Sequence, residues 1–268
     1  RVSDRLMSLT LDSKMSEHST TKDIKRLKKQ ASEFKDMAHK YKRNFGKAER
    51  EQRKALFDEA YKIMKDVDKL EQYIIDDLVN KAQVITATLV GANHYTVRNL
   101  RYNTVIIDEA GQALEPACWI PILKGKKVVL AGDHCQLPPT IKSDEAARGG
   151  LGITLLEKCI SLHPEAVVLL EEQYRMNEQI MGYSSKVFYD AKLVAHTSVA
   201  KHQLFPADAP VAFVDTAGCG FDEKNDTTSI SNPEEAGLLF KHLTQLVGEL
   251  AAHYDANNFP TIAVISPY

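Results

Sequence analysis

Two adjacent acidic residues directly follow a short apolar run. Residues 104–107, Thr-Val-Ile-Ile, have the β-branched composition of a buried strand, and Asp108 and Glu109 come next. In open parallel sheets, ligands bind at the carboxyl ends of the strands. An aspartate there can hold Mg²⁺ on nucleotide phosphates, and a glutamate beside it can orient and deprotonate an attacking water. Taken alone, the two acids are better explained as a turn and a helix cap.

A second polar loop follows the apolar run at residues 127–130. Gly132 permits a tight exit from this run, and Gln136 offers an uncharged donor and acceptor that suits contact with a phosphate. His134 and Cys135 lie between them. We do not interpret these two residues as a metal site, because no second pair of ligands accompanies them.

A third candidate is the tetrapeptide Gln173–Met176, which follows the apolar run Val167–Leu170. Arg175 carries a planar head group with several donors, and from the exit of a strand it can reach a phosphate across a cleft. Viewed by itself, the tetrapeptide is weak evidence. The ordinary alternative is a surface arginine that pairs with Glu171 or Glu172.

The chain beyond residue 82 has the pattern needed to position such loops. Short β-branched runs alternate with helical patterns, which favours parallel sheets covered by helices on both faces. The expected strands are 83–88, 104–107, 127–130, 167–170, 211–214 and 261–265. The expected helices are 114–121, 153–161, 178–189 and 234–253.

Residues from about 20 to 82 have a different texture, rich in charge and poor in glycine and proline. Apolar residues recur there at alternating spacings of three and four within 24–41 and 56–74, which is typical of heptad seams. With a turn at Asn-Phe-Gly 44–46, this spacing predicts an antiparallel helical hairpin. Between Lys22 and Leu70 there are 16 basic and 9 acidic residues. Such a basic surface fits either a solvated stalk or an arm that faces nucleic acid.

Composition narrows the class of protein. The 268 residues are 44% hydrophobic and 26% charged, with a formal net charge of −2, which excludes global disorder and a uniformly basic nucleic-acid coat. No run approaches the roughly 20 apolar residues of a membrane span.

The four cysteines contain no CxxC pair, so we expect reduced thiols and a cytoplasmic location, or a nuclear one in a eukaryote. The chain opens at Arg1 without a methionine, and we expect it to be an internal fragment.

Taken together, the three loops resemble motifs II, III and IV of superfamily 1 helicases. The matching segments are Asp-Glu-Ala-Gly-Gln at 108–112, Gly-Asp-His-Cys-Gln-Leu-Pro-Pro at 132–139 and Gln-Tyr-Arg-Met at 173–176. The branch is the 5′→3′ one that contains the nonsense-mediated-decay helicase and the immunoglobulin μ-binding helicase, and the resemblance covers about 83–268. It implies an α/β fold of RecA-like parallel sheets flanked by helices, with the hairpin as an insertion. It also implies ATP-driven translocation along single-stranded nucleic acid, either DNA or RNA, and the closer resemblance to the immunoglobulin μ-binding helicase favours DNA.

The resemblance implies a role for each matched residue. The catalytic set would be Asp108 and Glu109 as the Walker B pair for Mg²⁺ and water, with Gln136 and Arg175 at the γ-phosphate. The residues implied to bind the nucleotide and its Mg²⁺ are Asp108, Gln173 and Tyr174, with Tyr174 against the base. The residues implied to lie near the nucleic-acid backbone are Pro138, Pro139 and either Thr86 or Thr88, between which the pattern does not choose.

No G-x-x-x-x-G-K-[ST] phosphate loop occurs in the 268 residues. The printed chain therefore lacks the cradle and the lysine that hold the β- and γ-phosphates, and we expect it to be inactive as an ATPase by itself. The alternative is a non-catalytic coiled-coil interaction module on a degenerate nucleotide-binding fold. The expected domains are the hairpin at 1–82, the C-terminal part of a first RecA-like domain at 83–165 and the N-terminal part of a second at 166–268.

Overall fold

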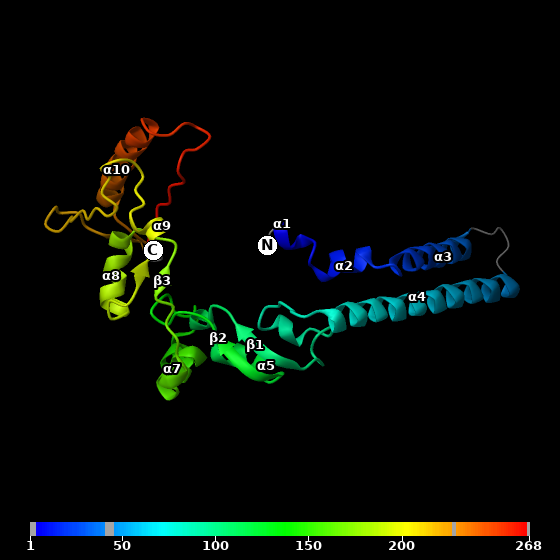
Figure 1. Ribbon diagram of the computed structural model, residues 1–268. Coiled ribbons are helices and arrows are strands. Elements are labelled where there is room, and N and C mark those ends of the chain that lie inside the picture. The colour runs from blue at the N-terminus through cyan, green and yellow to red at the C-terminus, as the bar shows by residue number, and fades with distance from the viewer. Residues whose placement is uncertain (1–3, 41–45, 227–228, 267–268) are drawn as a thin grey trace. The chain divides into compact units, whose positions relative to one another are not determined.

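The computed structural model describes residues 4–40, 46–226 and 229–266. The chain divides into two compact units, Arg1–Pro164 and Glu165–Tyr268 (Figure 1). Within the described residues, no helix combines the length and the apolar composition that a membrane crossing requires.

The first unit opens with helices, of which two are long and lie side by side (Figure 1). The four helices are α1 (Asp4–Met7), α2 (Leu11–Glu17), α3 (Thr21–His39) and α4 (Lys47–Lys81). Lys28 forms an ion pair with Glu71 at 2.7 Å, whereas the ring of His39 meets that of Phe57 at a centroid distance of 5.2 Å. A later residue of α3 thus contacts an earlier residue of α4, so the two helices are antiparallel.

The contact between α3 and α4 is made by the residues of the two heptad seams. Their buried members are Ile24, Ala31 and Ala38 on α3, and Ala60, Ile63, Val67 and Ile74 on α4. The spacing of three and four therefore predicts the contact surface correctly, because residues at that spacing share one face of a helix. Tyr41, Asn44 and Phe45, which the sequence places at the end of one seam and in the turn, lie outside the described residues.

A parallel pair of strands forms the sheet of the first unit. Strand β1 (Tyr102–Ile107) pairs with β2 (Gly125–Leu130), with Ile107 opposite Leu130. Val105 and Ile107 point into a core shared with Cys118 of helix α5 (Glu115–Ile122) and with Leu155 and Leu156 of helix α7 (Leu155–Leu162). Shorter helical turns complete the unit: η1 (Gly91–Asn93), η2 (Ala110–Gln112), α6 (Asp144–Ala146) and η3 (Ala147–Leu151).

The second unit holds another parallel pair. Strand β3 (Glu172–Gln173) pairs with β4 (Val194–Ala195), and helix α8 (Glu178–Phe188) connects them. Two parallel strands need such a crossover connection, because the chain must return to the starting end of the sheet before the second strand begins. The remaining elements are α9 (Thr197–Ala200), the antiparallel strands β5 (Lys224–Asp226) and β6 (Ser229–Ser231), and α10 (Pro233–Ala251). The turn η4 (Pro164–Ala166) lies at the junction of the units.

Four of the six expected strands are wrong, namely 83–88, 167–170, 211–214 and 261–265. A strand exists only where a neighbour completes its hydrogen-bond ladder, and these runs have no ladder partner among the described residues. Their apolar side chains stay in solvent, with Val168 83% and Ile265 89% exposed. The expectation of helices on both faces also fails for β1, since Ile106 on its second face is 69% exposed.

The expected helices, by contrast, form to within two residues at either end. Helix α7 shows the local cause, a reciprocal capping box. Thr154 is 1% exposed. Its backbone N–H donates to the Glu157 carboxylate at 2.6 Å, and its hydroxyl donates to the same carboxylate at 2.8 Å. The Glu157 N–H donates in turn to the Thr154 hydroxyl. These bonds, the one from the Thr154 backbone above all, hold the pKa of the Glu157 carboxyl below its ordinary value of 4.5.

We expect Glu157→Gln to lower the free energy of unfolding by about 1 kcal/mol at pH 7. A carboxyl with a depressed pKa contributes stability above its unfolded pKa and loses it as the pH falls through the folded value. The difference from wild type should therefore shrink below pH 4.5. Urea unfolding followed by the fluorescence of Trp119, the single tryptophan, measures it, with exposed Glu145→Gln as the control. A difference that stays constant down to pH 3 would contradict this origin.

Candidate functional site

Backbone hydrogen bonds join the two loops that leave β1 and β2. The Ala131 N–H donates to the Ile107 carbonyl, and the Ala110 N–H donates to the Ala131 carbonyl, each at 2.8 Å. These bonds continue the pairing beyond the ends of the strands. The segment that carries Asp108 and Glu109 thus leaves the sheet beside the segment that leads to Gln136. Both loops lie at the carboxyl edge of the parallel pair, where ligands bind in such sheets.

Two glycines allow these loops to touch. A Cβ atom added to Gly111 would lie 2.4 Å from the carbonyl oxygen of Asp133, and one added to Gly132 would lie 2.7 Å from the backbone nitrogen of Ala110. Both distances are shorter than any non-bonded contact allows, so these positions require glycine. The sequence indicated a tight exit at Gly132, but the close approach at Gly111 has no local signal.

We expect Gly111→Ala to lower the free energy of unfolding by about 1–3 kcal/mol, the usual cost of overpacking. The atom in the way belongs to the backbone of Asp133 and cannot swing aside as the end of a side chain would. Gly149→Ala is the matched control, because nothing lies within 4 Å of its added Cβ. Urea unfolding followed by Trp119 fluorescence compares the two. Equal stability of the two variants would disprove the tight contact.

The two acids after β1 are both exposed at the edge of the sheet. The N–H of Glu109 donates to the Asp108 carboxylate at 3.1 Å, and the Gln112 side chain reaches the Glu109 carboxylate at 3.5 Å. Glu109 has φ 52° and ψ 39°, a left-handed conformation that a residue with a side chain rarely adopts. Strain of this kind clusters at functional sites. Asp108 offers hard oxygen donors, which fit Mg²⁺ with its water shell.

Gln136 is exposed and belongs to a tightly turned loop. Its Nε2 donates to one oxygen of the Asp133 carboxylate at 2.7 Å, while the Cys135 N–H donates to the other at 2.9 Å. Asp133, His134 and Cys135 each offer one atom that could bind a metal ion, and these three atoms lie within 4.8 Å of one another. The Asp133 carboxylate already accepts from Cys135 and Gln136, so it shapes the turn that presents Gln136. The rejection of a metal site at His134 and Cys135 stays a prediction.

The four residues expected near a nucleic-acid backbone differ in exposure. Thr86, Thr88 and Pro138 are exposed, whereas Pro139 is buried. The Thr88 hydroxyl accepts the Gly91 N–H at 3.0 Å and so caps the turn η1.

In the second unit, Gln173 organises the loop that follows β3. Its Oε1 accepts the backbone N–H groups of Arg175 and Met176, both at 2.8 Å, and its Nε2 donates to the Met176 carbonyl at 2.7 Å. These three bonds engage both ends of the amide. Gln173 therefore fixes the backbone from which Arg175 projects, a role that the sequence did not indicate.

Tyr174 contacts Glu172 and His196, neither of which the sequence linked to this tyrosine. Its hydroxyl donates to the Glu172 carboxylate at 2.8 Å, and its ring stacks on that of His196 with centroids 4.3 Å apart and an interplanar angle of 27°. The hydrogen bond to Glu172 raises the pKa of the Tyr174 phenol above its ordinary value. The sequence signal for His196 was its place directly after the segment that forms β4, but that strand was not expected.

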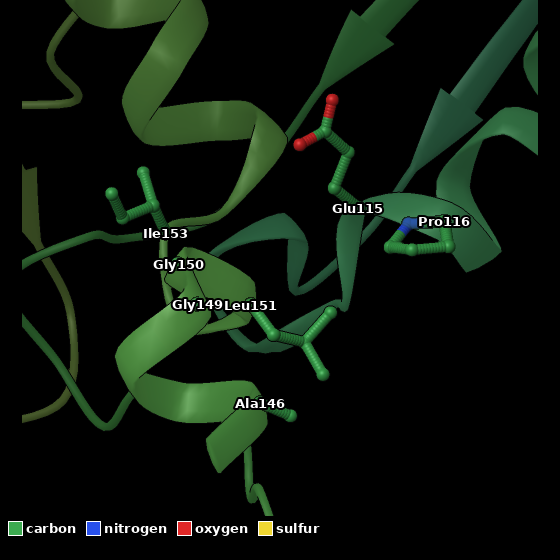
Figure 2. Close-up of a pocket in the computed structure, with 7 residues that line it drawn as sticks. All are labelled: Glu115, Pro116, Ala146, Gly149, Gly150, Leu151 and Ile153. Carbon is green, nitrogen blue, oxygen red and sulfur yellow. The ribbon is translucent and has the colours of Figure 1, made fainter.

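A cavity of about 380 Å³ lies apart from these residues, in the first unit (Figure 2). It is lined by Glu115, Pro116, Ala146, Gly149, Gly150, Leu151 and Ile153. The Glu115 carboxylate accepts from Lys158 and from the Trp119 indole, and the Lys158 contact above all lowers its pKa. None of the sequence-predicted site residues lines this cavity.

Comparison with known proteins identifies the class of protein. Residues 2–144 and residues 151–268 each match an AAA domain family. The DNA-binding protein SMUBP-2 of Rattus norvegicus is 39% identical over an alignment of 244 positions, which covers 84% of this chain and 24% of that protein. The DNA polymerase alpha-associated DNA helicase A of Schizosaccharomyces pombe is 34% identical over 235 aligned positions, which cover 81% of this chain and 34% of the relative. An uncharacterized ATP-dependent helicase of Methanocaldococcus jannaschii is 35% identical over 201 aligned positions, which cover 69% of this chain and 30% of the relative.

These matches and the parallel sheets define a RecA-like α/β protein with AAA domains. The chain belongs to the superfamily 1 helicases, in the group of the immunoglobulin μ-binding helicase. It spans about a quarter to a third of the length of these curated relatives.

Proposed function

We propose that the intact protein is an ATP-dependent helicase, which couples ATP hydrolysis to movement along nucleic acid and to separation of its strands. The observation that carries this proposal is the junction of the two loops at the carboxyl edge of β1 and β2. There, backbone bonds and two glycine contacts keep the acids after β1 beside the turn that presents Gln136. Two acids and an uncharged amide that are held together at one edge of the sheet suit nucleotide hydrolysis.

The roles of the residues follow from their chemistry. Asp108 would hold Mg²⁺, which when bound neutralises charge on the nucleotide phosphates. Glu109 would orient the attacking water and take its proton, and Gln136 would contact the γ-phosphate. Arg175 would neutralise charge on the γ-phosphate, and Tyr174 would stack on the base. Gln173 is proposed to act on the nucleotide only through its hold on the Arg175 backbone.

We further propose that residues 1–82 are a helical insertion, that 83–165 belong to a first RecA-like domain and that 166–268 belong to a second. The division of the chain near residue 164 supports the boundary between the two RecA-like domains. The basic surface of α3 and α4 fits a solvated stalk or an arm facing nucleic acid. The rival non-catalytic module is not favoured, because the relatives are named as helicases.

The proposed partner is single-stranded DNA, with Thr86 and Pro138 as contacts to its backbone and Thr88 and Pro139 as supports behind them. The names of the relatives, a DNA-binding protein and a DNA polymerase alpha-associated DNA helicase, support DNA over RNA. They also support a place in the cytoplasm or nucleus for this chain.

The deciding experiment measures ATP hydrolysis and strand separation by the intact protein. We expect single-stranded DNA to stimulate hydrolysis, and we expect duplexes with a 5′ tail to be separated faster than duplexes with a 3′ tail. Matched RNA substrates test the preference for DNA. ATP hydrolysis that is absent with every nucleic acid would overturn the proposal.

A further inference from the structure

His196 and Tyr174 occupy equivalent places at the ends of neighbouring parallel strands. Gln173 of β3 lies opposite Ala195 of β4, and the His196 N–H donates to the Gln173 carbonyl at 2.9 Å. The next residue of each strand therefore leaves the sheet at the same edge. Their rings meet as a stacked pair, with centroids 4.3 Å apart.

The imidazole of His196 is also held by hydrogen bonds to Ser198. Its Nδ1 accepts the Ser198 N–H at 3.2 Å and lies 2.8 Å from the Ser198 hydroxyl, so His196 caps the turn α9. Because Nδ1 accepts from the backbone, the proton of the neutral ring lies on Nε2. The ring that backs Tyr174 is thus held by its own strand and by the turn that follows it.

The Tyr174 ring is held at two points and open elsewhere. His196 covers one face and Glu172 binds the hydroxyl, and Tyr174 is still 61% exposed. An aromatic ring restrained in this way loses little freedom when a flat ligand stacks on its other face. Offset stacking is also the favoured geometry for such a layer of rings.

We propose that His196 is a positioning residue for the nucleobase of ATP, which it serves by backing the ring of Tyr174 so that the base stacks on the opposite face. This inference rests on the proposed function, in which Tyr174 meets the base. His196 itself does not touch the nucleotide. Its contribution is to hold the tyrosine ring in the plane that the base requires.

Two substitutions separate the two tasks of His196. His196→Asn keeps a side chain that can cap α9 but removes the ring, whereas His196→Phe keeps a ring for Tyr174 but removes the cap. In the intact protein we expect His196→Asn to raise KM for ATP about 2- to 10-fold with little change in kcat, which is the range of one aromatic contact. We expect His196→Phe to restore most of the wild-type KM.

A competitor without a base provides the control. Inorganic tripolyphosphate should inhibit wild type and His196→Asn with equal inhibition constants, because it makes no stacking contact. In a double-mutant cycle, His196→Asn should add nothing to the KM of Tyr174→Ala.

Three results would overturn the inference: an unchanged KM in His196→Asn, a His196→Phe variant as impaired as His196→Asn, or additive effects in the cycle. A failure of the proposed function would give a different result, because the wild-type protein would then hydrolyse no ATP.

Discussion

Glu109→Gln is expected to lower kcat for ATP hydrolysis by the intact protein about 10²- to 10⁴-fold, while ATP still binds. The substitution keeps the size of the side chain and the left-handed backbone at this position, but it removes the group that takes a proton from the attacking water. Binding persists because the proposed contacts to the phosphates and base come from other residues. Single-turnover hydrolysis and a separate nucleotide-binding titration measure the two quantities.

Two further variants define what this result means. Glu145→Gln, an exposed acid of the same unit outside the site, should hydrolyse ATP as wild type does. Glu109→Asp keeps the charge but withdraws it by one methylene, so it should recover only part of the lost rate. Near-normal turnover in Glu109→Gln, or a loss accompanied by a lower melting temperature, would argue against a catalytic role.

Local patterns predicted the helices and the loops well. The spacing of three and four identified the buried residues between α3 and α4, because that spacing is set within one helix. The acids were singled out because they directly follow one apolar run, and Gln136 because it lies in the loop after the next run, at the strand ends where parallel sheets bind ligands. Each of these signals lies within a stretch of a few residues.

Features that depend on distant partners were not predictable. The runs 167–170 and 261–265 have the composition of strands, yet a strand also needs a neighbour, and composition does not say whether one is present. The contact between Gly111 and the Asp133 carbonyl joins two loops across the sheet. The stacking of His196 on Tyr174 likewise depends on the register of β3 against β4.

Gln173 shows how a motif can leave the role of a residue open. The family resemblance implied a direct contact with the nucleotide, and that contact stays a prediction. The structure shows that the amide bonds the backbone of Arg175 and Met176 on one side and the Met176 carbonyl on the other. A residue type and a position leave both roles open, and only the conformation of the loop distinguishes them.

Arg175→Ala is expected to reduce kcat for ATP by roughly 10³- to 10⁵-fold, the range for arginines that neutralise a transferring phosphoryl group. The ordinary alternative was a surface ion pair with a neighbouring glutamate. Within the described residues no ion pair joins the Arg175 guanidinium to Glu171 or Glu172, and Glu172 accepts the Tyr174 hydroxyl instead. Since Arg175 is exposed, its removal should leave the melting temperature nearly unchanged.

Arg175→Lys and Gln173→Ala together test how the guanidinium acts. Lysine keeps the charge but loses the planar fork, so it should recover only a small part of the rate. Gln173→Ala leaves the arginine in place but removes the bond to its backbone N–H and the two bonds to Met176 that hold the loop, so it should lower kcat more than it raises KM. Full recovery by lysine would mean that charge alone suffices. A Gln173→Ala variant that turns over like wild type would show that the loop positions Arg175 without the amide.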